Sequence, residues 1–259
     1  METVSFPALD ASVKGYLWDD YDTLAAHRVR PALIICPGGG YNHCSPREQD
    51  APALQFLAMG FQVFVIQYSC GDRAGRYRPL RELAQAVCEL RRRHEAWRIN
   101  PDKIAVLGFS AGGHLAASLG ALWDDPEVRL PVQARPDALI LCYPVISTKE
   151  FAHEDSALRV SGGDGALRGK MHLWDRVTPN FPPTFLWHGG ADDCVPPENS
   201  LLLAVALKKH GVPFEYHLFG EGAHGISTCA QETETPDPVC RAWLSLCKTW
   251  LCRRFGYTP

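Results

Sequence analysis

The feature that most constrains the fold is an alternation of short apolar runs with longer segments of helical periodicity. The apolar runs have the length and β-branched content of strands buried on both faces, as in a parallel sheet. They lie at Ala32–Cys36, Phe61–Tyr68, Ile104–Phe109, Ala138–Ile146, Thr184–Trp187 and Phe214–Phe219. The helical segments lie at Arg47–Met59, Leu80–His94, Gly112–Leu122, Pro197–His210 and Pro238–Arg254. This order predicts an α/β protein whose doubly wound, mostly parallel sheet carries helices on both faces.

The organisation of the chain favours one unit. Its 259 residues contain no internal repeat and no linker rich in Pro, Gly or Ser. Open α/β sheets often exceed 200 residues, so we expect residues 1–259 to form a single domain. The segment before residue 30 is expected to add one or two antiparallel edge strands, of which Ser12–Trp18 is the clearer. The long irregular stretch Ser147–Pro183 is more typical of a lid or a substrate wall than of disorder.

Charge and hydropathy exclude several classes of partner. Lys and Arg number 26 against 29 Asp and Glu, a formal net charge of −3. So balanced a charge does not indicate a nucleic acid or an anionic membrane as an obligatory partner. No run approaches the roughly 18 apolar residues that span a bilayer. The first residues lack the basic and apolar segments of a secretion signal, so we expect a cytoplasmic protein.

Ten cysteines raise the question of disulfides or metal ligands. Several lie inside apolar runs, such as Cys36 and Cys142, or on a helical stripe, such as Cys240 and Cys247. In a reducing compartment such cysteines are small buried hydrophobic residues. Neither C-x-x-C nor H-E-x-x-H occurs, so the sequence predicts no metal and no cofactor.

The strongest chemical motif is the G-x-S-x-G at Gly108–Gly112, with Ser110 at its centre. The motif alone is weak, but it follows the strand-like IAVLGF and opens the helix-like AGGHLAASLGALW. A strand, a sharp turn and a helix in this order push a serine hydroxyl out above a sheet. The glycines suit a strained turn that leaves little room for β-carbons. We therefore predict that Ser110 is a nucleophile.

A serine nucleophile needs a base, and the base needs an orienting group. His224 lies in the glycine-rich GEGAHG directly after the strand-like FEYHLF, where it can reach the carboxyl edge of the sheet. The carboxylate is expected from HGGADDCVP, which also follows a predicted strand and contains Asp192 and Asp193. Because these two are adjacent, only one is expected to reach the imidazole. His114, one helical turn after Ser110, is expected to support the core or the site from below.

Three successive glycines follow the first buried run, in Pro37-Gly38-Gly39-Gly40-Tyr41. Backbone N–H groups in such a loop can turn inward without side chains in the way, which suits the oxyanion of acyl transfer. We assign donors to Gly39 and Gly40, with the N–H of Ala111 completing the hole. A phosphate-binding loop is the alternative, but no Lys-Ser/Thr follows and G-x-G-x-x-G is absent.

The sequence resembles the α/β-hydrolase superfamily, and more narrowly its bacterial acetylxylan esterase and lipase-like family, which includes sugar esterases. The resemblance rests on CPGGGY with the downstream SPRE, and on INPDKIAVLGFSAGGHLAAS, PPTFLWHGGADDCVPPENS and GEGAHGIS, which cover most of residues 30–230. The chain order Ser, Asp, His agrees with this superfamily. Its loops often read G-x-x-D-x-x-V, a spacing that Asp192 fits between Gly189 and Val195, so we predict Asp192 as the orienting acid. Pro37 replaces the histidine of the HGGG form, which leaves the backbone donors in place.

The resemblance implies hydrolysis of short acyl esters, commonly acetyl groups on plant polysaccharide or oligosaccharide, without metal or cofactor. We expect Ser110 to attack the ester and His224 to act as general base and then general acid, with a small-molecule ester such as an acetylated oligosaccharide as substrate. A serine peptidase of the prolyl-oligopeptidase type is one alternative, but 259 residues leave no room for the usual amino-terminal propeller. The other is a non-catalytic receptor on a hydrolase fold, which would lack a member of the Ser, His and Asp set.

Overall fold

The computed structural model describes residues 1–19 and 29–258 and contains an eight-stranded sheet of order β1-β2-β4-β3-β5-β6-β7-β8. From β3 onward every neighbouring pair is parallel. The strands are β1 Glu2–Ala8, β2 Ala11–Leu17, β3 Arg30–Cys36, β4 Gln62–Gln67, β5 Ile99–Phe109, β6 Ala138–Cys142, β7 Thr184–Gly189 and β8 Phe214–Phe219. The prediction of a doubly wound, mostly parallel α/β sheet is confirmed, and the fold is that of an α/β-hydrolase.

The amino-terminal segment supplies two antiparallel strands. β1 pairs with β2, and β2 pairs in turn with β4, in both cases antiparallel. The expectation of edge strands holds for β1, whereas β2, which contains most of the predicted Ser12–Trp18, lies between β1 and β4. Residues 20–28, at the end of that predicted segment, lie outside the described residues.

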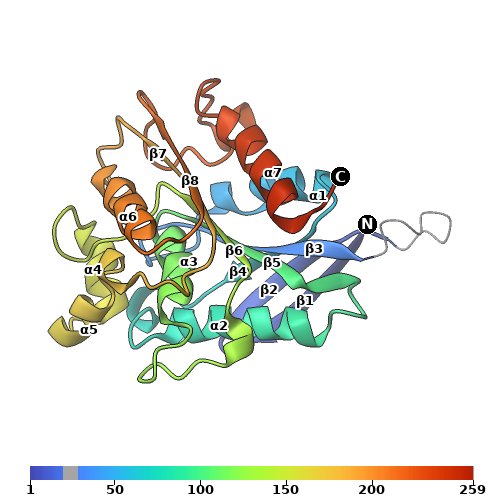
Figure 1. The fold of residues 1–259 in the computed structure, drawn as a ribbon, viewed down its shortest axis with the longest axis horizontal. Coiled ribbons are helices and arrows are strands. Elements are labelled where there is room, and N and C mark those ends of the chain that lie inside the picture. The colour runs from blue at the N-terminus through green and yellow to red at the C-terminus, as the bar shows by residue number, and fades with distance from the viewer. Residues whose placement is uncertain (20–28, 259) are drawn as a thin grey trace.

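The described residues contain seven α-helices, of which α1, α2, α3, α6 and α7 pack against the sheet (Figure 1). Figure 1 shows α1 and α7 on one side of the sheet and α2 on the other. The helices are α1 Asp50–Ala58, α2 Arg78–Arg92, α3 Ala111–Leu122, α4 Glu154–Ser161, α5 Gly165–Lys170, α6 Glu198–Lys209 and α7 Ala242–Phe255. Short 3₁₀ helices are η2 Pro46–Glu48, η3 Gly71–Arg73, η4 Val132–Ala134, η5 Trp174–Arg176 and η6 Gln231–Thr233.

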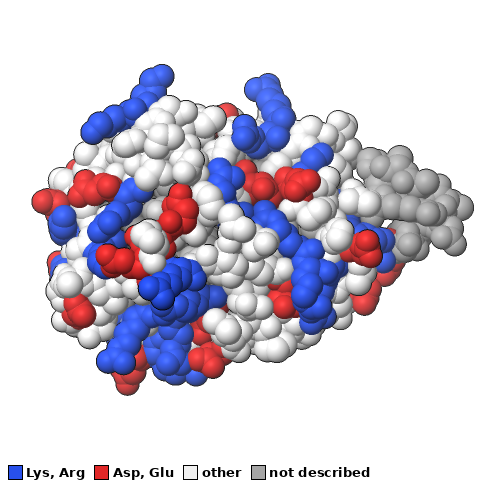
Figure 2. Space-filling view, turned by 60° about the horizontal axis from the view of Figure 1, so that its bottom comes forward, with Lys and Arg blue, Asp and Glu red and all other residues white. Residues whose placement is uncertain are grey.

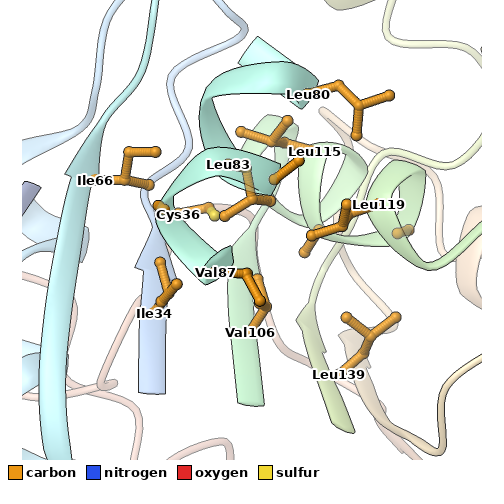
Figure 3. Packing of buried hydrophobic residues seen from close by; sticks show 14 of the residues in the cluster. Ile34, Cys36, Ile66, Leu80, Leu83, Val87, Val106, Leu115, Leu119 and Leu139 are labelled. Carbon is orange, nitrogen blue, oxygen red and sulfur yellow. The ribbon is translucent and has the colours of Figure 1, made fainter. Parts of the chain in front are cut away.

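Side chains alternate between two cores along the parallel strands. In β3, Ile34 and Cys36 join the core under α2, α3 and α6, while Leu33 and Ile35 join the core under α1 and α7. Figure 3 shows the first core, in which Leu83 of α2 and other helix residues face the strands. Burying one such aliphatic side chain contributes about 1.5–3 kcal/mol, so the helices that cover the sheet are held by their buried apolar side chains. A rigid sheet with two covered faces leaves its carboxyl edge for the loops that carry chemistry.

The strand predicted from Ile104 begins at Ile99, and the helix predicted from Pro238 begins at Ala242. Two other predicted boundaries are wrong for tertiary reasons. The helix expected from Arg47 begins at Asp50, because residues 46–48 form the separate turn η2 and Glu48 is turned into the interior. The strand expected to reach Ile146 ends at Cys142. There Tyr143 adopts a left-handed φ of 37°, and the chain leaves the sheet so that the N–H of Val145 donates to the carbonyl of Ser110 at 3.1 Å.

The stretch 147–183 is not irregular. It contains α4, α5 and η5, although the sequence showed no helical periodicity there. Both helices are short and are set by their caps: the side chain of His153 accepts the N–H of Ser156, and that of Asp164 accepts two N–H groups at the start of α5. Gly162 ends α4 with a left-handed φ of 59°. In the described part of the chain, no helix is long and apolar enough to cross a membrane.

Candidate active site

Ser110 lies at the tight turn that joins β5 to α3. Its backbone is strained, with φ 53° and ψ −118°, a conformation that is uncommon for a residue with a side chain. The turn is possible because residue 112 is a glycine. A β-carbon there would lie 2.1 Å from the carbonyl oxygen of Cys36. The predicted strand, turn and helix are therefore present, and the hydroxyl of Ser110 faces a pocket at the carboxyl edge of the sheet.

The structure brings Ser110, His224 and Asp192 into one hydrogen-bonded row. The Oγ of Ser110 lies 2.9 Å from Nε2 of His224, and Nδ1 of His224 lies 2.6 Å from Oδ2 of Asp192. With Nδ1–H donating to the carboxylate, Nε2 is left as an acceptor for the serine proton. These distances are within the reach that a serine, its base and an orienting acid require.

The loops that carry Asp192 and His224 follow the neighbouring strands β7 and β8. They are tied together by their backbones, since the N–H of Ala191 donates to the carbonyl of Gly222 at 3.2 Å. The N–H of Gly190 likewise donates to the carbonyl of Phe219 at 2.6 Å. The distance between Asp192 and His224 is therefore set by the sheet edge and not by two independent loops.

The environment of Asp192 favours a carboxylate. Its Oδ1 accepts the N–H groups of Cys194 at 3.1 Å and Val195 at 2.9 Å, while Oδ2 faces His224 and Nε2 of His188 at 3.2 Å. Burial raises the pKa of Asp192, but the hydrogen bonds from His188 and His224, the charge of His224 and the Val195 N–H outweigh it, and the net pKa is well below the usual value. Asp193 is exposed and makes no hydrogen bond within the described residues. Of the two candidates, the one in contact with His224 is Asp192.

His188 is a residue of the site for which sequence reasoning assigned no role. It is fully buried at the end of β7, its Nδ1 accepts the hydroxyl of Ser200 at 2.6 Å, and its Nε2–H is shared between Asp192 and the carbonyl of Val195. It therefore contacts the same carboxylate oxygen, Oδ2 of Asp192, that faces His224. The only signal in the sequence was its place in HGGADD, one residue before the glycine pair.

The glycine loop after β3 presents free N–H groups beside Ser110. Gly39 and Gly40 have left-handed φ values of 115° and 63°, and a β-carbon on Gly39 would lie 2.3 Å from the carbonyl oxygen of His43. Within the described part of the chain, no hydrogen bond uses the N–H of Gly39, Gly40 or Ala111. The N–H of Gly38, in contrast, donates to Glu48 at 2.7 Å. The predicted three donors are thus available to an oxygen in the pocket.

Tyr41 and His114 support the glycine loop from below. The hydroxyl of Tyr41 donates to Nδ1 of His114 at 2.8 Å, and Nε2–H of His114 donates to the carbonyl of Met171 at 2.9 Å. Burial lowers the pKa of His114 to about 4, so the ring is neutral at pH 7. As expected, His114 supports the site without reaching the pocket, and it connects the loop to α3 and to the 147–183 stretch.

Glu48 and Tyr143 form a second support that sequence reasoning missed. Glu48 is almost completely buried; its Oε2 accepts Gly38 N–H, and its Oε1 accepts the hydroxyl of Tyr143 at 2.7 Å. The Tyr143 oxygen accepts the N–H of Ser227 at 2.8 Å, and the Tyr143 ring packs edge-on against the ring of His224 with centroids 5.1 Å apart. Burial raises the pKa of Glu48 despite these donors. The sequence analysis missed Glu48 because it placed this residue inside a helix predicted to begin at Arg47.

The pocket in front of Ser110 has a volume of about 340 Å³, and its lining mixes polar with apolar surface. Its walls come from the glycine loop and from the 147–183 stretch, and they include Asn42, His43, Arg47, Glu48, His153, Asp155, Arg159 and Cys194. Among residues 1–19 and 29–258, no group of three or more His, Cys, Asp or Glu side chains is arranged to hold a metal ion. The chemistry available here is that of a serine, an imidazole, a carboxylate and backbone donors.

Comparison with known proteins shows similarity to several esterases. The BD-FAE family model matches residues 19–138. An acetylxylan esterase of Xylanibacter ruminicola is 29% identical over 205 residues, which cover 75% of this chain and 41% of that protein. The chain spans less than half the length of the curated relatives it matches.

Solved structures match over nearly the whole chain. The acetyl ester-xyloside bifunctional hydrolase from Caldicellulosiruptor lactoaceticus is 34% identical, with a TM-score of 0.86 and coverage of 99% of this chain and 97% of that one. The carboxylesterase Cest-2923 from Lactobacillus plantarum WCFS1 is 27% identical, with a TM-score of 0.88 and full coverage of both chains. On this fold and these similarities, the chain belongs to the α/β-hydrolase superfamily and, within it, to the family of bacterial acetylxylan esterase-like and lipase-like proteins.

Proposed function

We propose that the protein is a serine carboxylesterase that hydrolyses short-chain acyl esters, and that acetyl esters of sugars or xylo-oligosaccharides are its substrates. The observation that carries this proposal is the uninterrupted row of hydrogen bonds from Ser110 through His224 to Asp192, with separations of 2.9 Å and 2.6 Å. Beside it lie the N–H groups of Gly39, Gly40 and Ala111, which donate to no other group among the residues that the structure describes. The names of the similar proteins, an acetylxylan esterase and an acetyl ester-xyloside hydrolase, agree with this chemistry.

The proposed reaction has two halves. In the first, the Oγ of Ser110 attacks the ester carbonyl carbon while Nε2 of His224 takes the hydroxyl proton, and the carbonyl oxygen becomes an oxyanion. Collapse of this intermediate breaks the bond to the alcohol, which leaves with the proton from His224. In the second half, His224 takes a proton from water, the hydroxide attacks the acyl-enzyme, and the acid is released as Ser110 recovers its proton.

Each supporting group has a part in this reaction. Asp192 holds the Nδ1–H tautomer of His224 and stabilises the imidazolium that forms when the serine proton is transferred. The N–H groups of Gly39, Gly40 and Ala111 stabilise the oxyanion; one such donor is worth on the order of 10²–10³ in turnover. Because the donors are fixed by Tyr41 and Glu48 before substrate arrives, no reorganisation is needed at the moment of reaction.

The pocket supports a small acyl group and a polar alcohol. A volume of about 340 Å³ suits a sugar ester better than a long hydrocarbon chain. The wall formed by His153, Asp155 and Arg159 is polar, whereas a lipase presents a broad apolar surface to fat droplets. We therefore propose a preference for acyl chains of four carbons or fewer.

The test is a hydrolysis panel of nitrophenyl esters with acyl chains from two to twelve carbons, together with acetylated xylo-oligosaccharides. We expect the highest kcat/KM on the shortest esters, release of acetate from the oligosaccharides, and no activation at an oil surface. Ser245→Ala on the exposed face of α7 is the matched control for Ser110→Ala. A preference for long chains would refute the substrate proposal, and equal activity of both variants would refute the role of Ser110.

A further inference from the structure

A second cavity, larger than the pocket at Ser110, lies on the protein between the turn of the β1–β2 hairpin and the start of α2. Its volume is about 560 Å³, and four arginines line it: Arg73, Arg76, Arg78 and Arg81. The remaining lining residues include Asp10, Asp72 and Gly162. Neither the proposed reaction nor the support of the glycine loop uses any of these side chains.

A third cavity, of about 340 Å³, lies next to each of the first two. It shares Asp155 and Arg159 with the pocket at Ser110, and it shares Asp72 and Gly162 with the arginine cavity. The three cavities therefore follow one another along the side of α4, from the nucleophile to the start of α2. In Figure 2, Lys and Arg side chains gather at the lower left, on the side of the molecule where Figure 1 places α4 and α5.

The guanidinium groups that line the arginine cavity and the third cavity differ in their partners. Arg78 forms an ion pair with Asp10 at 2.6 Å, and Arg81 donates to the carbonyl of Arg76 at 2.9 Å. In the described part of the chain, the guanidinium groups of Arg73, Arg76 and Arg159 make no hydrogen bond or ion pair. Five guanidinium groups thus face three carboxylates, and three of the five are available to a ligand.

The loop that carries these arginines is held in a defined, strained conformation. Arg76 and Tyr77 both have left-handed backbones, with φ of 56° and 59°, immediately before α2 begins at Arg78. Two consecutive non-glycine residues in this region cost free energy, and such strain gathers at functional sites. The loop also contacts the end of α4, because a β-carbon on Gly75 would lie 3.3 Å from the Cα of Gly162.

We propose that this chain of cavities binds the alcohol part of the substrate, and that Arg73 and Arg76 bind a carboxylate on it, so that the preferred substrate is an acyl ester of an acidic, uronate-bearing oligosaccharide. The proposal rests on the esterase function above and names its substrate class. The planar guanidinium group matches a carboxylate with two parallel hydrogen bonds. Asp72 and Asp155 along the path disfavour a doubly charged phosphate and can accept hydrogen bonds from sugar hydroxyls.

The test compares two acetylated xylo-oligosaccharides that differ only in a glucuronosyl branch, with nitrophenyl acetate as a substrate too small to reach Arg73. For the wild-type protein we expect kcat/KM on the acidic oligosaccharide to exceed that on the neutral one by about five- to tenfold, mainly through KM. Raising the salt concentration should reduce this ratio, because exposed charges are screened. In the double variant Arg73→Gln/Arg76→Gln the ratio should fall to about one, with nitrophenyl acetate hydrolysis unchanged.

The matched control is Arg253→Gln/Arg254→Gln, which makes the same change of charge at the exposed end of α7, on the opposite side of the sheet. It should leave the ratio as in the wild type. Equal kcat/KM of the wild type on both oligosaccharides would overturn the proposal, as would an equal shift in the control. An equal loss on all three substrates in the double variant would overturn it as well.

Binding to Ser110→Ala separates this proposal from the esterase function. Calorimetry should show the acidic oligosaccharide binding about five- to tenfold more tightly than the neutral one, and the added Arg73→Gln/Arg76→Gln change should abolish the difference. If no ester is hydrolysed but this difference is present, the proposed function fails and the anion site stands. Inorganic phosphate and glucuronate can each be tested as competitors of the acidic oligosaccharide in this binding experiment. If phosphate competes more strongly than glucuronate, the site binds phosphate and the carboxylate assignment is refuted.

Discussion

Replacing Asp192 by asparagine tests the orientation of His224 most directly. The side chain is anchored through Oδ1, which accepts the N–H groups of Cys194 and Val195 at 3.1 Å and 2.9 Å. An asparagine must keep its carbonyl oxygen at that position, since an amide NH₂ cannot accept from these donors. Its NH₂ then takes the place of Oδ2 and points at Nδ1 of His224. A donor at this point favours the tautomer with the proton on Nε2, which cannot take the proton of Ser110.

The size of the effect follows from the loss of the base. An acid-to-amide change that imposes the wrong tautomer costs about 10³–10⁴ in turnover, which corresponds to about 4–5.5 kcal/mol of transition-state stabilisation. Stability should fall by less, about 1–3 kcal/mol, because His188 loses one acceptor but keeps the carbonyl of Val195. The loss of transition-state stabilisation is thus expected to exceed the loss of folding stability.

The assay is kcat on nitrophenyl acetate together with the melting temperature, measured for Asp192→Asn and Asp193→Asn side by side. Asp193 is the matched control, because it is adjacent, carries the same charge and is exposed. We expect Asp193→Asn to change turnover by less than about threefold, since it leaves the tautomer intact. A larger loss at Asp193, or more than a tenth of wild-type turnover in Asp192→Asn, would show that the reasoning is wrong.

Three further predictions concern the nucleophile and the two buried supports. Ser110→Ala should lower turnover by about 10⁴–10⁶ without unfolding, and more than about a hundredth of wild-type turnover would refute the assignment. Glu48→Gln leaves the Gly38 N–H or the Tyr143 hydroxyl without its acceptor, so urea unfolding should show a loss of about 1–3 kcal/mol, whereas no loss would contradict the network. The pKa of His114 falls from 6.5 to about 4 on folding, so the unfolded chain binds more protons between these values. The free energy of unfolding should therefore drop by about 3 kcal/mol as pH falls from 6.5 to 4, and His114→Gln should lack this component.

The sequence by itself determined the features that depend on local pattern. Short runs of β-branched residues and helical periodicity are set by neighbouring residues, so the order of strands and helices and the fold class were predictable. The turn at Ser110 was also predictable from the sequence. Its glycines are needed because a β-carbon at residue 112 would collide with the backbone of Cys36. Ser110, Asp192 and His224 follow the parallel strands β5, β7 and β8. That they lie at one edge was predictable, because the loops after parallel strands meet at the carboxyl edge of the sheet. Their catalytic roles remain predictions.

Only the tertiary structure decided which polar groups face inward and which cavities lie side by side. Glu48 is buried because Tyr143, 95 residues away, supplies a donor at 2.7 Å, and no periodicity around Glu48 indicates such a partner. The early end of β6 has the same cause, since Tyr143 leaves the strand to meet Glu48 and His224. The cavity that borders both the pocket at Ser110 and the arginine cavity lies where the end of α4 packs against the loop before α2. Burying a polar group is stable only when a partner pairs with it, and a distant partner is known only once the chain has folded.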